Sequence, residues 1–266
     1  MKVTFDTNTL KGAVTPELND GKSAVSDCMA VNAALKTGRI RGYFSEAMVA
    51  LDALGQQDKV DVVGGARIVS ETRATGPRSM TISIGPRWQR TPISDIFLAR
   101  LQAARALGMR AMIGPRRIGD SLPVKGFGDD FYESYAEPAE LVARGEKANE
   151  VDAALASRGL GRARAVKLGL EYSERCGKTG EWWPEGLGRA RGDTEREAVR
   201  QAINEWADGD AIAAHVGYRN GLFCTEDFGG GAGEQSALHP VQRAWLATAF
   251  GVVFVTLSEL ATRLDS

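Results

Sequence analysis

Acidic side chains follow candidate strands at both ends of the chain. Asp6 comes directly after the β-prone run Val3 to Phe5, and Asp227 lies just beyond the short apolar run Leu222 to Thr225. Asp210 lies in a helical pattern shortly before that second run. Carboxylates that follow parallel strands project into one crevice, where their repulsion calls for a cation. Hard oxygen ligands suit Mg²⁺ or Mn²⁺, so these residues indicate metal-assisted hydrolysis of a phosphodiester.

A further acid is expected after the second candidate strand, Arg39 to Phe44. Ser45 follows this strand and is a favourable residue for capping a helix. The helix predicted after it carries Glu46 in its first turn and Asp52 nearly two turns later. Either carboxylate could complete the acidic set, and the residues alone leave the choice open.

The elements that must position these acids alternate between strand and helix. Ser23 to Leu35 has helical spacing of apolar residues, and Thr194 to Trp206 has a helical pattern that continues or restarts at Asp210 to Val216. Near the end, Pro240 to Phe250 reads as a helix and Val252 to Leu257 as a last strand. This alternation predicts a three-layer α/β/α fold with a mostly parallel central sheet.

The middle of the chain departs from this alternation, and we assign residues 64–193 to a mainly helical insertion within a single domain of residues 1–266. Two β-type segments around Gly76-Pro77 predict a hairpin. Helices are expected around it, joined by irregular connections that are rich in glycine or proline. The expected helices are Pro92 to Leu107 and Glu137 to Glu174, the second interrupted at Gly159 to Gly161, and the expected connections are Gly114 to Phe131 and Trp182 to Pro184.

Composition limits the classes of protein to consider. A chain of 266 residues with 43 % hydrophobic content can bury a large core. Its net charge of -1 lacks the basic balance of many nucleic-acid binders, so any contact with nucleic acid must be local. Three scattered cysteines do not form a disulfide framework, and no apolar run is long enough for a membrane span. We therefore expect a cytoplasmic protein with no membrane association.

The two ends of the chain together resemble the PIN-domain ribonucleases of the toxin-antitoxin type. Val3 to Leu10, with the sequence VTFDTNTL, is similar to the hydrophobic strand and Asp-Thr-Asn with which these domains begin. Asp210 to His215 and Gly221 to Phe228 are similar to their distal acidic helix and their Thr-x-Asp strand end. The resemblance covers about the first sixty and last sixty-five residues by motif, and the middle has no counterpart in it.

The resemblance implies a metal-dependent endoribonuclease that cuts single-stranded RNA with Mg²⁺ or Mn²⁺. It implies Asp6, Asp210 and Asp227 as catalytic metal ligands. The fourth ligand in such domains usually lies nearly two turns into the second helix, which favours Asp52 over Glu46. An antitoxin partner and a homodimer are both compatible with this family.

The same resemblance implies supporting residues around the acids. Asn8 and Thr225 would hydrogen-bond to the ligands, and Ser45 matches the small polar residue at the end of the second strand. Basic runs in the middle of the chain are usually solvated helix faces, but here they could hold phosphates on either side of the cut. The residues expected to do so are Arg110, Arg116, Arg117, Arg162 and Arg164.

Three other interpretations compete with the metal-dependent nuclease. Asp6-Thr7-Asn8 could be only a turn at a strand end. A phosphatase of the haloacid-dehalogenase type would need an aspartate where this chain has Asn8, and His215 and His239 lack the context of a nucleophile and base. A PIN-like module that binds RNA or protein without cutting is the remaining alternative.

Overall fold

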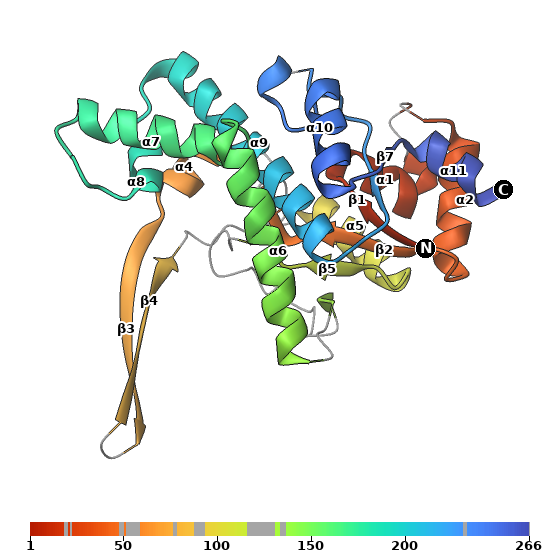
Figure 1. Ribbon diagram of the computed structural model, residues 1–266, viewed down its shortest axis with the longest axis horizontal. Helices are drawn as coiled ribbons and strands as arrows, with labels where there is room; N and C mark the ends of the chain where they lie inside the picture. Colours follow the sequence, from red (N-terminus) through yellow and green to blue (C-terminus); the bar gives the residue numbers. More distant parts are fainter. Residues whose placement is uncertain are drawn as a thin grey trace.

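The computed structural model describes residues 1–18, 21, 23–47, 51, 59–76, 79–87, 94–115, 131–133, 137–230 and 233–265. Its centre is a five-stranded parallel sheet with the strand order β5-β2-β1-β6-β7 (Figure 1). The strands are β1 (Lys2–Phe5), β2 (Arg41–Ser45), β5 (Arg110–Met112), β6 (Leu222–Cys224) and β7 (Phe254–Val255). The predicted mostly parallel sheet is therefore confirmed.

Strand β1 is the middle strand and joins the two ends of the chain. Val3 pairs with Gly42 of β2 on one side and with Leu222 of β6 on the other. Side chains alternate between the two faces of the sheet, so Val3 and Phe5 pack on one face while Thr4 points to the other. Both faces are covered, which accounts for the nearly uninterrupted apolar runs of the strands.

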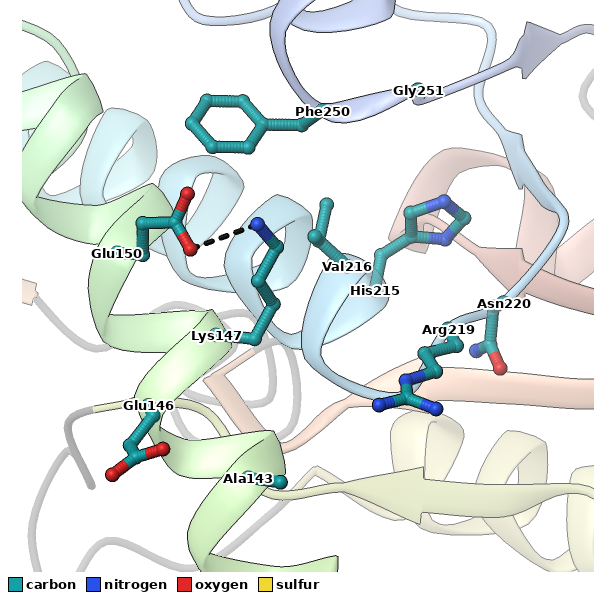
Figure 2. A pocket seen from close by; sticks show the side chains of 10 residues that line it. All are labelled: Ala143, Glu146, Lys147, Glu150, His215, Val216, Arg219, Asn220, Phe250 and Gly251. Atoms are coloured by element: carbon teal, nitrogen blue, oxygen red, sulfur yellow. Dashed lines mark hydrogen bonds and ion pairs between the residues drawn. The ribbon is translucent and has the colours of Figure 1, made fainter.

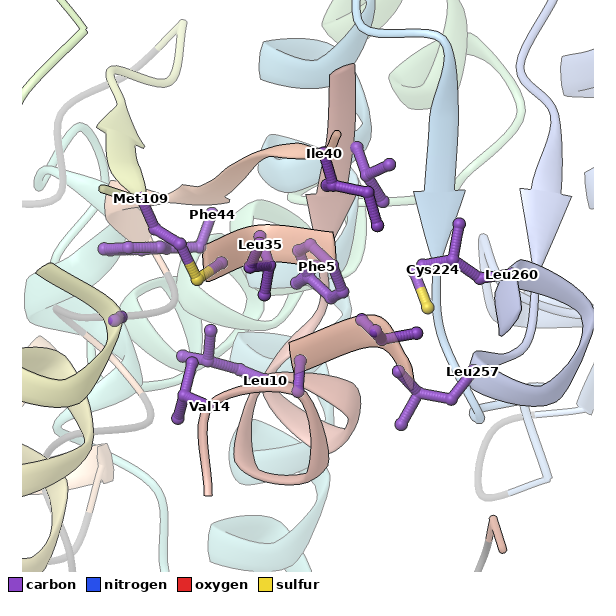
Figure 3. Close-up of a cluster of buried hydrophobic side chains, with 14 of the residues drawn as sticks. Phe5, Leu10, Val14, Leu35, Ile40, Phe44, Met109, Cys224, Leu257 and Leu260 are labelled. Atoms are coloured by element: carbon purple, nitrogen blue, oxygen red, sulfur yellow. The ribbon is translucent and has the colours of Figure 1, made fainter. Parts of the chain in front are cut away.

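One face of the sheet is covered by four helices, α1 (Thr7–Val14), α2 (Val25–Lys36), α5 (Asp95–Ala106) and α11 (Leu257–Asp265). Figure 3 shows their apolar side chains against the sheet, with Leu10 and Leu260 near Phe5 and Cys224. The other face is covered by α6 (Pro138–Ser157), α9 (Gly192–Gly217) and α10 (Pro240–Phe250). The predicted three-layer α/β/α fold is confirmed.

A separate hydrophobic cluster lies beyond the sheet, among α4 (Lys59–Gly64), α7 (Ala163–Arg175), α8 (Trp183–Leu187) and the first half of α9. Val199 to Ala207 of α9 pack in this cluster, whereas Ala211 to Val216 of the same helix pack against the sheet. One helix therefore belongs to two cores. The described elements also include two short 3₁₀ helices, η1 (Pro16–Leu18) and η3 (Gly233–Gln235).

The predicted hairpin is confirmed as the antiparallel strands β3 (Arg67–Gly76) and β4 (Ser79–Arg87). It projects away from the body on the side of α4 and α8 (Figure 1). Segment 64–193, assigned to an insertion, also supplies α5 and β5, and β5 is a strand of the central sheet. This part of the chain is thus not wholly peripheral to the sheet.

Other local predictions meet mixed outcomes. The helical interruption at Gly159 to Gly161 is confirmed, since α6 ends at Ser157 and α7 begins at Ala163. The loop expected at Trp182 to Pro184 is wrong, because α8 begins at Trp183 with proline in its first turn, where proline is tolerated. Most of the helix expected after Ser45, and most of the connection from Gly114 to Phe131, lie outside the described residues.

In the described residues, no helix combines the length and the apolar character needed to cross a membrane. The α9 helix is the longest described, with 26 residues, but charged side chains recur along it.

Helices α7 and α8 contact each other through glycine backbone. A Cβ atom added at Gly169 would lie 2.1 Å from the carbonyl oxygen of Trp183, and one added at Gly186 would lie 1.9 Å from the carbonyl oxygen of Gly169. Real atoms cannot approach so closely, so any larger residue would push the two backbones apart. By contrast, a Cβ added at Gly145 of α6 meets nothing within 4 Å.

We predict opposite effects of alanine at these two helical glycines. Gly169→Ala should lower the free energy of unfolding by about 1–3 kcal/mol, because the added methyl overpacks the helix contact. Gly145→Ala should raise it by about 0.5–1 kcal/mol, because alanine loses less conformational entropy in a helix. Urea denaturation measures both, and the same sign for the two variants would contradict the packing described.

Candidate functional site

Four strands bring their carboxyl ends to one edge of the sheet. Asp6 follows β1 directly, Glu46 follows β2, and Thr225 follows β6. Gly114 lies two residues beyond β5. Because neighbouring parallel strands end on the same side, the residues after them line a common edge. This edge is where the sequence placed the acidic site.

The carboxylate of Asp6 is held by three hydrogen bonds. Its Oδ1 accepts from the backbone N–H of Thr7 at 2.7 Å, which caps the first turn of α1. Its Oδ2 accepts from Asn8 Nδ2 and from Thr225 Oγ1, both at 2.7 Å. The Asp6 side chain is therefore fixed from its own helix and from the end of β6.

The loop after β6 is tied to the same group of side chains. Asn8 Oδ1 accepts from the backbone N–H of Glu226 at 2.9 Å, and Thr225 Oγ1 accepts from that of Asp227 at 3.0 Å. Asp227 Oδ1 in turn accepts from the backbone N–H of Gly229 at 2.7 Å and forms a turn. The structure thus brings together Asp6, Asn8, Thr225 and Asp227. The hydrogen bond between Asp6 and Thr225 joins side chains that are 219 residues apart in the sequence.

Two more of the predicted acids lie along the edge on the other side of Asp6. Asp210 is buried in α9, and a Cβ added at Gly114 would lie 1.7 Å from its Oδ2. The Asp210 carboxylate therefore reaches the end of β5 because residue 114 has no side chain. Glu46 is also buried and follows β2, the strand between β1 and β5. Asp52 lies outside the described residues.

These acids form a row along the edge. Asp227 lies beyond the end of β6, Asp6 follows β1, Glu46 follows β2, and Asp210 of α9 lies against Gly114 beyond β5, in the order of the strands. With about 4.8 Å between neighbouring strands, the four strands span about 14 Å. In keeping with this spacing, no three His, Cys, Asp or Glu side chains of the described ranges are grouped closely enough to hold a metal ion.

The donor set of this row nevertheless suits Mg²⁺ or Mn²⁺, because every acid in it offers hard oxygen ligands. Mg²⁺ often keeps several waters and takes only one or two protein carboxylates, with substrate phosphates supplying further oxygens. A row of carboxylates can meet that demand, whereas a zinc site would need a closed set of ligands.

Arg243 of α10 is a residue of this site that the sequence interpretation missed. Its guanidinium donates to the carbonyl oxygens of Asp227 and, at 2.7 Å, of Leu238. It lies over the rings of Phe228 and Phe254, at 4.6 and 4.9 Å from their centroids. Burial lowers the pKa of Arg243, while the charge of Asp227 acts to raise it. A lone arginine in the apolar helix Pro240–Phe250 was the available signal.

The predicted phosphate-binding arginines have other contacts. Arg162 Nε lies 3.1 Å from Asp152 Oδ2, which joins the start of α7 to α6. Arg164 Nη2 donates to Gln201 Oε1 of α9 at 3.4 Å. Arg110 begins β5 and is half-buried. Arg116 and Arg117 lie outside the described residues.

Beneath the other face of β1 lies a buried polar group. Asn220 Nδ2 donates to Thr4 Oγ1 at 2.9 Å, and Thr4 Oγ1 lies 2.9 Å from His215 Nδ1. A threonine hydroxyl has one hydrogen to donate and two lone pairs, so the direction of its bond with His215 Nδ1 is set by the tautomer of the ring. Burial lowers the pKa of His215 to about 4, so the ring is neutral at pH 7.

His215 and Asn220 also line a cavity of about 580 Å³ between α6, the end of α9 and the end of α10 (Figure 2). Lys147 and Glu150 of α6 form an ion pair of 2.8 Å at its wall. The cavity lies beside the start of β6, where Gly221 donates to the backbone of Lys2. It is therefore at the opposite end of the strands from the acidic row, and we do not assign the chemistry to it.

Replacing Thr225 tests the hydrogen bonds around Asp6. Thr225→Val keeps the shape of a fully buried side chain but removes the donor to Asp6 and the acceptor for the Asp227 N–H. We predict a loss of about 1–3 kcal/mol in the free energy of unfolding, because buried polar partners lose their bonds. The control is Thr248→Val on exposed α10 surface, expected within about 0.5 kcal/mol of wild type. Equal effects in urea denaturation would contradict the role of Thr225.

The neutral state of His215 predicts a dependence of stability on pH. Its folded pKa of about 4 is below the ordinary value of 6.5, so the unfolded chain binds the proton more readily. The contribution of the neutral ring to the free energy of unfolding is fully present above pH 6.5. About 3 kcal/mol of it is lost as the pH falls toward 4. Burial raises the pKa of Glu205, so this carboxyl makes the free energy of unfolding decrease as the pH rises. It does so equally in wild type and in the histidine variants.

The pH test compares unfolding of wild type and His215→Asn between pH 7 and pH 4. As the pH falls, the free energy of unfolding should decrease more steeply in wild type than in His215→Asn. Only in wild type does unfolding release a buried neutral ring that then binds a proton. His239→Asn removes the other histidine and keeps a good N-cap for α10, so it must retain the steep fall. A steep fall in His215→Asn as well would show that another group causes it.

Comparison with protein-family models, curated proteins and solved structures gave no match. The likeness to PIN domains therefore stays a resemblance carried by the motifs around Asp6 and Asp227. Function has to be inferred from the chain's own residues and their arrangement.

Proposed function

We propose that this protein is a divalent-metal-dependent nuclease that hydrolyses phosphodiester bonds of single-stranded RNA. The observation that carries the proposal is the Asp6 carboxylate, held by Asn8 and Thr225 at the head of a row of acids. Two motifs from opposite ends of the chain meet in that group, in the order and pairing that the PIN resemblance implies. A turn at a strand end would not need the Thr225 and Asn8 contacts.

The hydrogen bonds of Asp6 set how it would hold a metal. Its Oδ2 accepts from both Asn8 and Thr225, whereas its Oδ1 accepts from the backbone N–H of Thr7. Asp6 would therefore contribute Oδ1 to a metal more readily than Oδ2. Glu46 and Asp210, buried further along the row, would contribute on the side of β2 and β5. Asp227 Oδ1 accepts the backbone N–H of Gly229, so Asp227 would contribute Oδ2 to the metal.

A bound Mg²⁺ or Mn²⁺ would supply an activated water and a Lewis acid for a phosphate oxygen. The chain's own residues do the positioning. Asn8 and Thr225 hold the orientation of Asp6, and Arg243 fixes the backbone at Asp227. The positive charge of Arg243 also offsets repulsion within the acidic row.

A PIN-like module that binds RNA or a protein without cutting is the second candidate. The spacing of the acids favours it, because no group of three metal-binding side chains occurs within the described part of the chain. The two candidates differ in whether Mn²⁺ binds at the acidic edge and supports cleavage of RNA.

The test compares cleavage of a labelled single-stranded RNA with Mn²⁺ by wild type and by Asp210→Asn. We predict at least about a 100-fold loss of rate in the variant, because the substitution removes a charged ligand and keeps the side-chain shape. Mn²⁺ should raise the melting temperature of wild type and raise that of the variant less. Asp95→Asn, an exposed carboxylate in the first turn of α5, is the matched control and should cleave normally.

The outcomes separate the two candidates. Wild type that binds the RNA but neither cleaves it nor gains stability from Mn²⁺ would be the non-cutting module. Equal cleavage by wild type and Asp210→Asn would mean that the activity does not use the acidic row.

A further inference from the structure

Phe228 is an exposed aromatic residue beside one of the acids of the row. It follows Asp227 directly in the chain and is 52 % exposed. The other residues of the loop from Thr225 to Gly230 are polar, acidic or glycine. A single exposed apolar residue is common on protein surfaces, so exposure alone does not indicate a function. The position of the Phe228 ring and its support by other residues do distinguish it.

The support comes from Arg243 of α10. Its guanidinium lies 4.6 Å from the centroid of the Phe228 ring and 4.9 Å from that of the Phe254 ring. The same guanidinium donates to the carbonyl oxygens of Asp227 and Leu238, which fixes its position. It can cover only one face of the Phe228 ring, and about half of the residue stays open to solvent.

The backbone is also fixed on both sides of Phe228. The N–H of Asp227 donates to Thr225 Oγ1 at 3.0 Å, and the carbonyl oxygen of Gly229 accepts from the N–H of Gly233 at 2.9 Å. Gly229 has a φ of +69°, and a Cβ there would lie 2.8 Å from the backbone nitrogen of His239, so only glycine fits. The ring is therefore held in place before a ligand binds, which lowers the entropy cost of binding.

Arg243 also links the ring to the acids. Burial lowers the pKa of the Arg243 guanidinium, and the negative charges of Asp227 and Asp6 act in the opposite direction. The residue that supports the Phe228 ring therefore lies within electrostatic reach of two acids of the row.

An aromatic ring at this place suits a base of a nucleic acid. The acids repel phosphates unless a cation neutralises them, whereas an uncharged ring attracts a base by stacking on its face. Every base has such a face, so the contact tolerates any sequence. Bases within a duplex are stacked on both sides, and only an unpaired base can be splayed out onto a side chain. A protein partner fits one ring poorly, because protein interfaces use about 20 residues a side.

We propose that the Phe228 ring stacks on an unpaired base next to the phosphodiester bond that is cut, and that Arg243 positions the ring. This inference rests on the proposed nuclease function and deepens it. It assigns the selection of single-stranded RNA to one side chain beside Asp227, separate from the residues that would bind the metal.

The first experiment removes the base from the substrate. A labelled RNA of about ten nucleotides is made in versions that each lack one base, and cleavage is measured with Mn²⁺. For wild type, kcat/KM should fall at least about tenfold when the base at one position next to the cut is missing. Phe228→Leu should show a similar loss on the intact RNA, mainly in KM, and no further loss from the missing base. The two changes remove the same contact, so their effects should not add.

Two control variants separate stacking from packing. Phe228→Tyr keeps the aromatic face, so it should retain the dependence on the base, whereas leucine keeps only the apolar bulk. Phe250→Leu changes a partly buried phenylalanine beside the cavity at the other end of the strands, and it should cleave like wild type. The melting temperature of each variant shows whether the fold is retained.

The second experiment measures stacking without relying on cleavage. The same RNA carries 2-aminopurine, a fluorescent base whose emission falls when it stacks, at the position found above or at each position in turn. It is titrated with Asp210→Asn, in which cleavage should be slow, and with the double variant Asp210→Asn, Phe228→Leu. Quenching should occur with the first protein, and the double variant should bind at least about tenfold more weakly.

The outcomes keep the two proposals apart. RNA that is cut by wild type and by Phe228→Leu alike, with equal dependence on every base, overturns the stacking and leaves the nuclease function standing. Quenching that depends on Phe228 in a protein that cuts no RNA supports the stacking and overturns the nuclease function. Quenching that is equal in the two titrated proteins, or RNA that binds to neither, overturns the stacking.

Discussion

The pairing of β1 with both β2 and β6 is the constraint on which the site depends. Residues 2–5 are the middle strand of the sheet, so the first residues of the chain are fixed between segments that follow much later. The N–H of Asp6 continues the ladder by donating to the carbonyl of Cys224 at 3.0 Å. This bond aligns the ends of β1 and β6. The side chains of Asp6 and Thr225 are therefore within hydrogen-bonding distance of each other. If the register slipped by one residue, Asp6 would point into the core instead.

The group around Asp6 serves structure and candidate chemistry with the same atoms. The Asp6 carboxylate caps α1, accepts from Thr225 and is the group that would bind a cation. Each partner that fixes the Asp6 carboxylate also competes with a cation for its oxygens. Substitution of a partner would therefore change both the stability of the fold and the binding of a cation. Arg243 relieves part of this conflict, since it binds backbone carbonyls at the loop and leaves the carboxylate oxygens alone.

The sequence predicted the strand-end acids well because strand ends follow from local pattern, and parallel strands must end together. The PIN resemblance implied Asn8 and Thr225 as hydrogen-bonding partners of the acids, and the hairpin followed from its alternation and its breaker. Strand β5 was missed because three residues, Arg110–Met112, carry no periodicity, and only pairing with β2 makes them a strand. The approach of Asp210 to Gly114 could not be predicted, since it depends on how α9 crosses the end of β5. Whether the acids hold a metal stays a prediction.

The α9 helix has a mechanical consequence for the acidic row. Its first half is embedded in the layer of α4, α7 and α8, its second half in the layer against the sheet, and Asp210 lies at the junction of the two. A helix is stiff along its axis, so it transmits small shifts instead of absorbing them. The position of Asp210 at the end of β5 therefore depends on the packing of the outer helices as well as on the packing of the sheet.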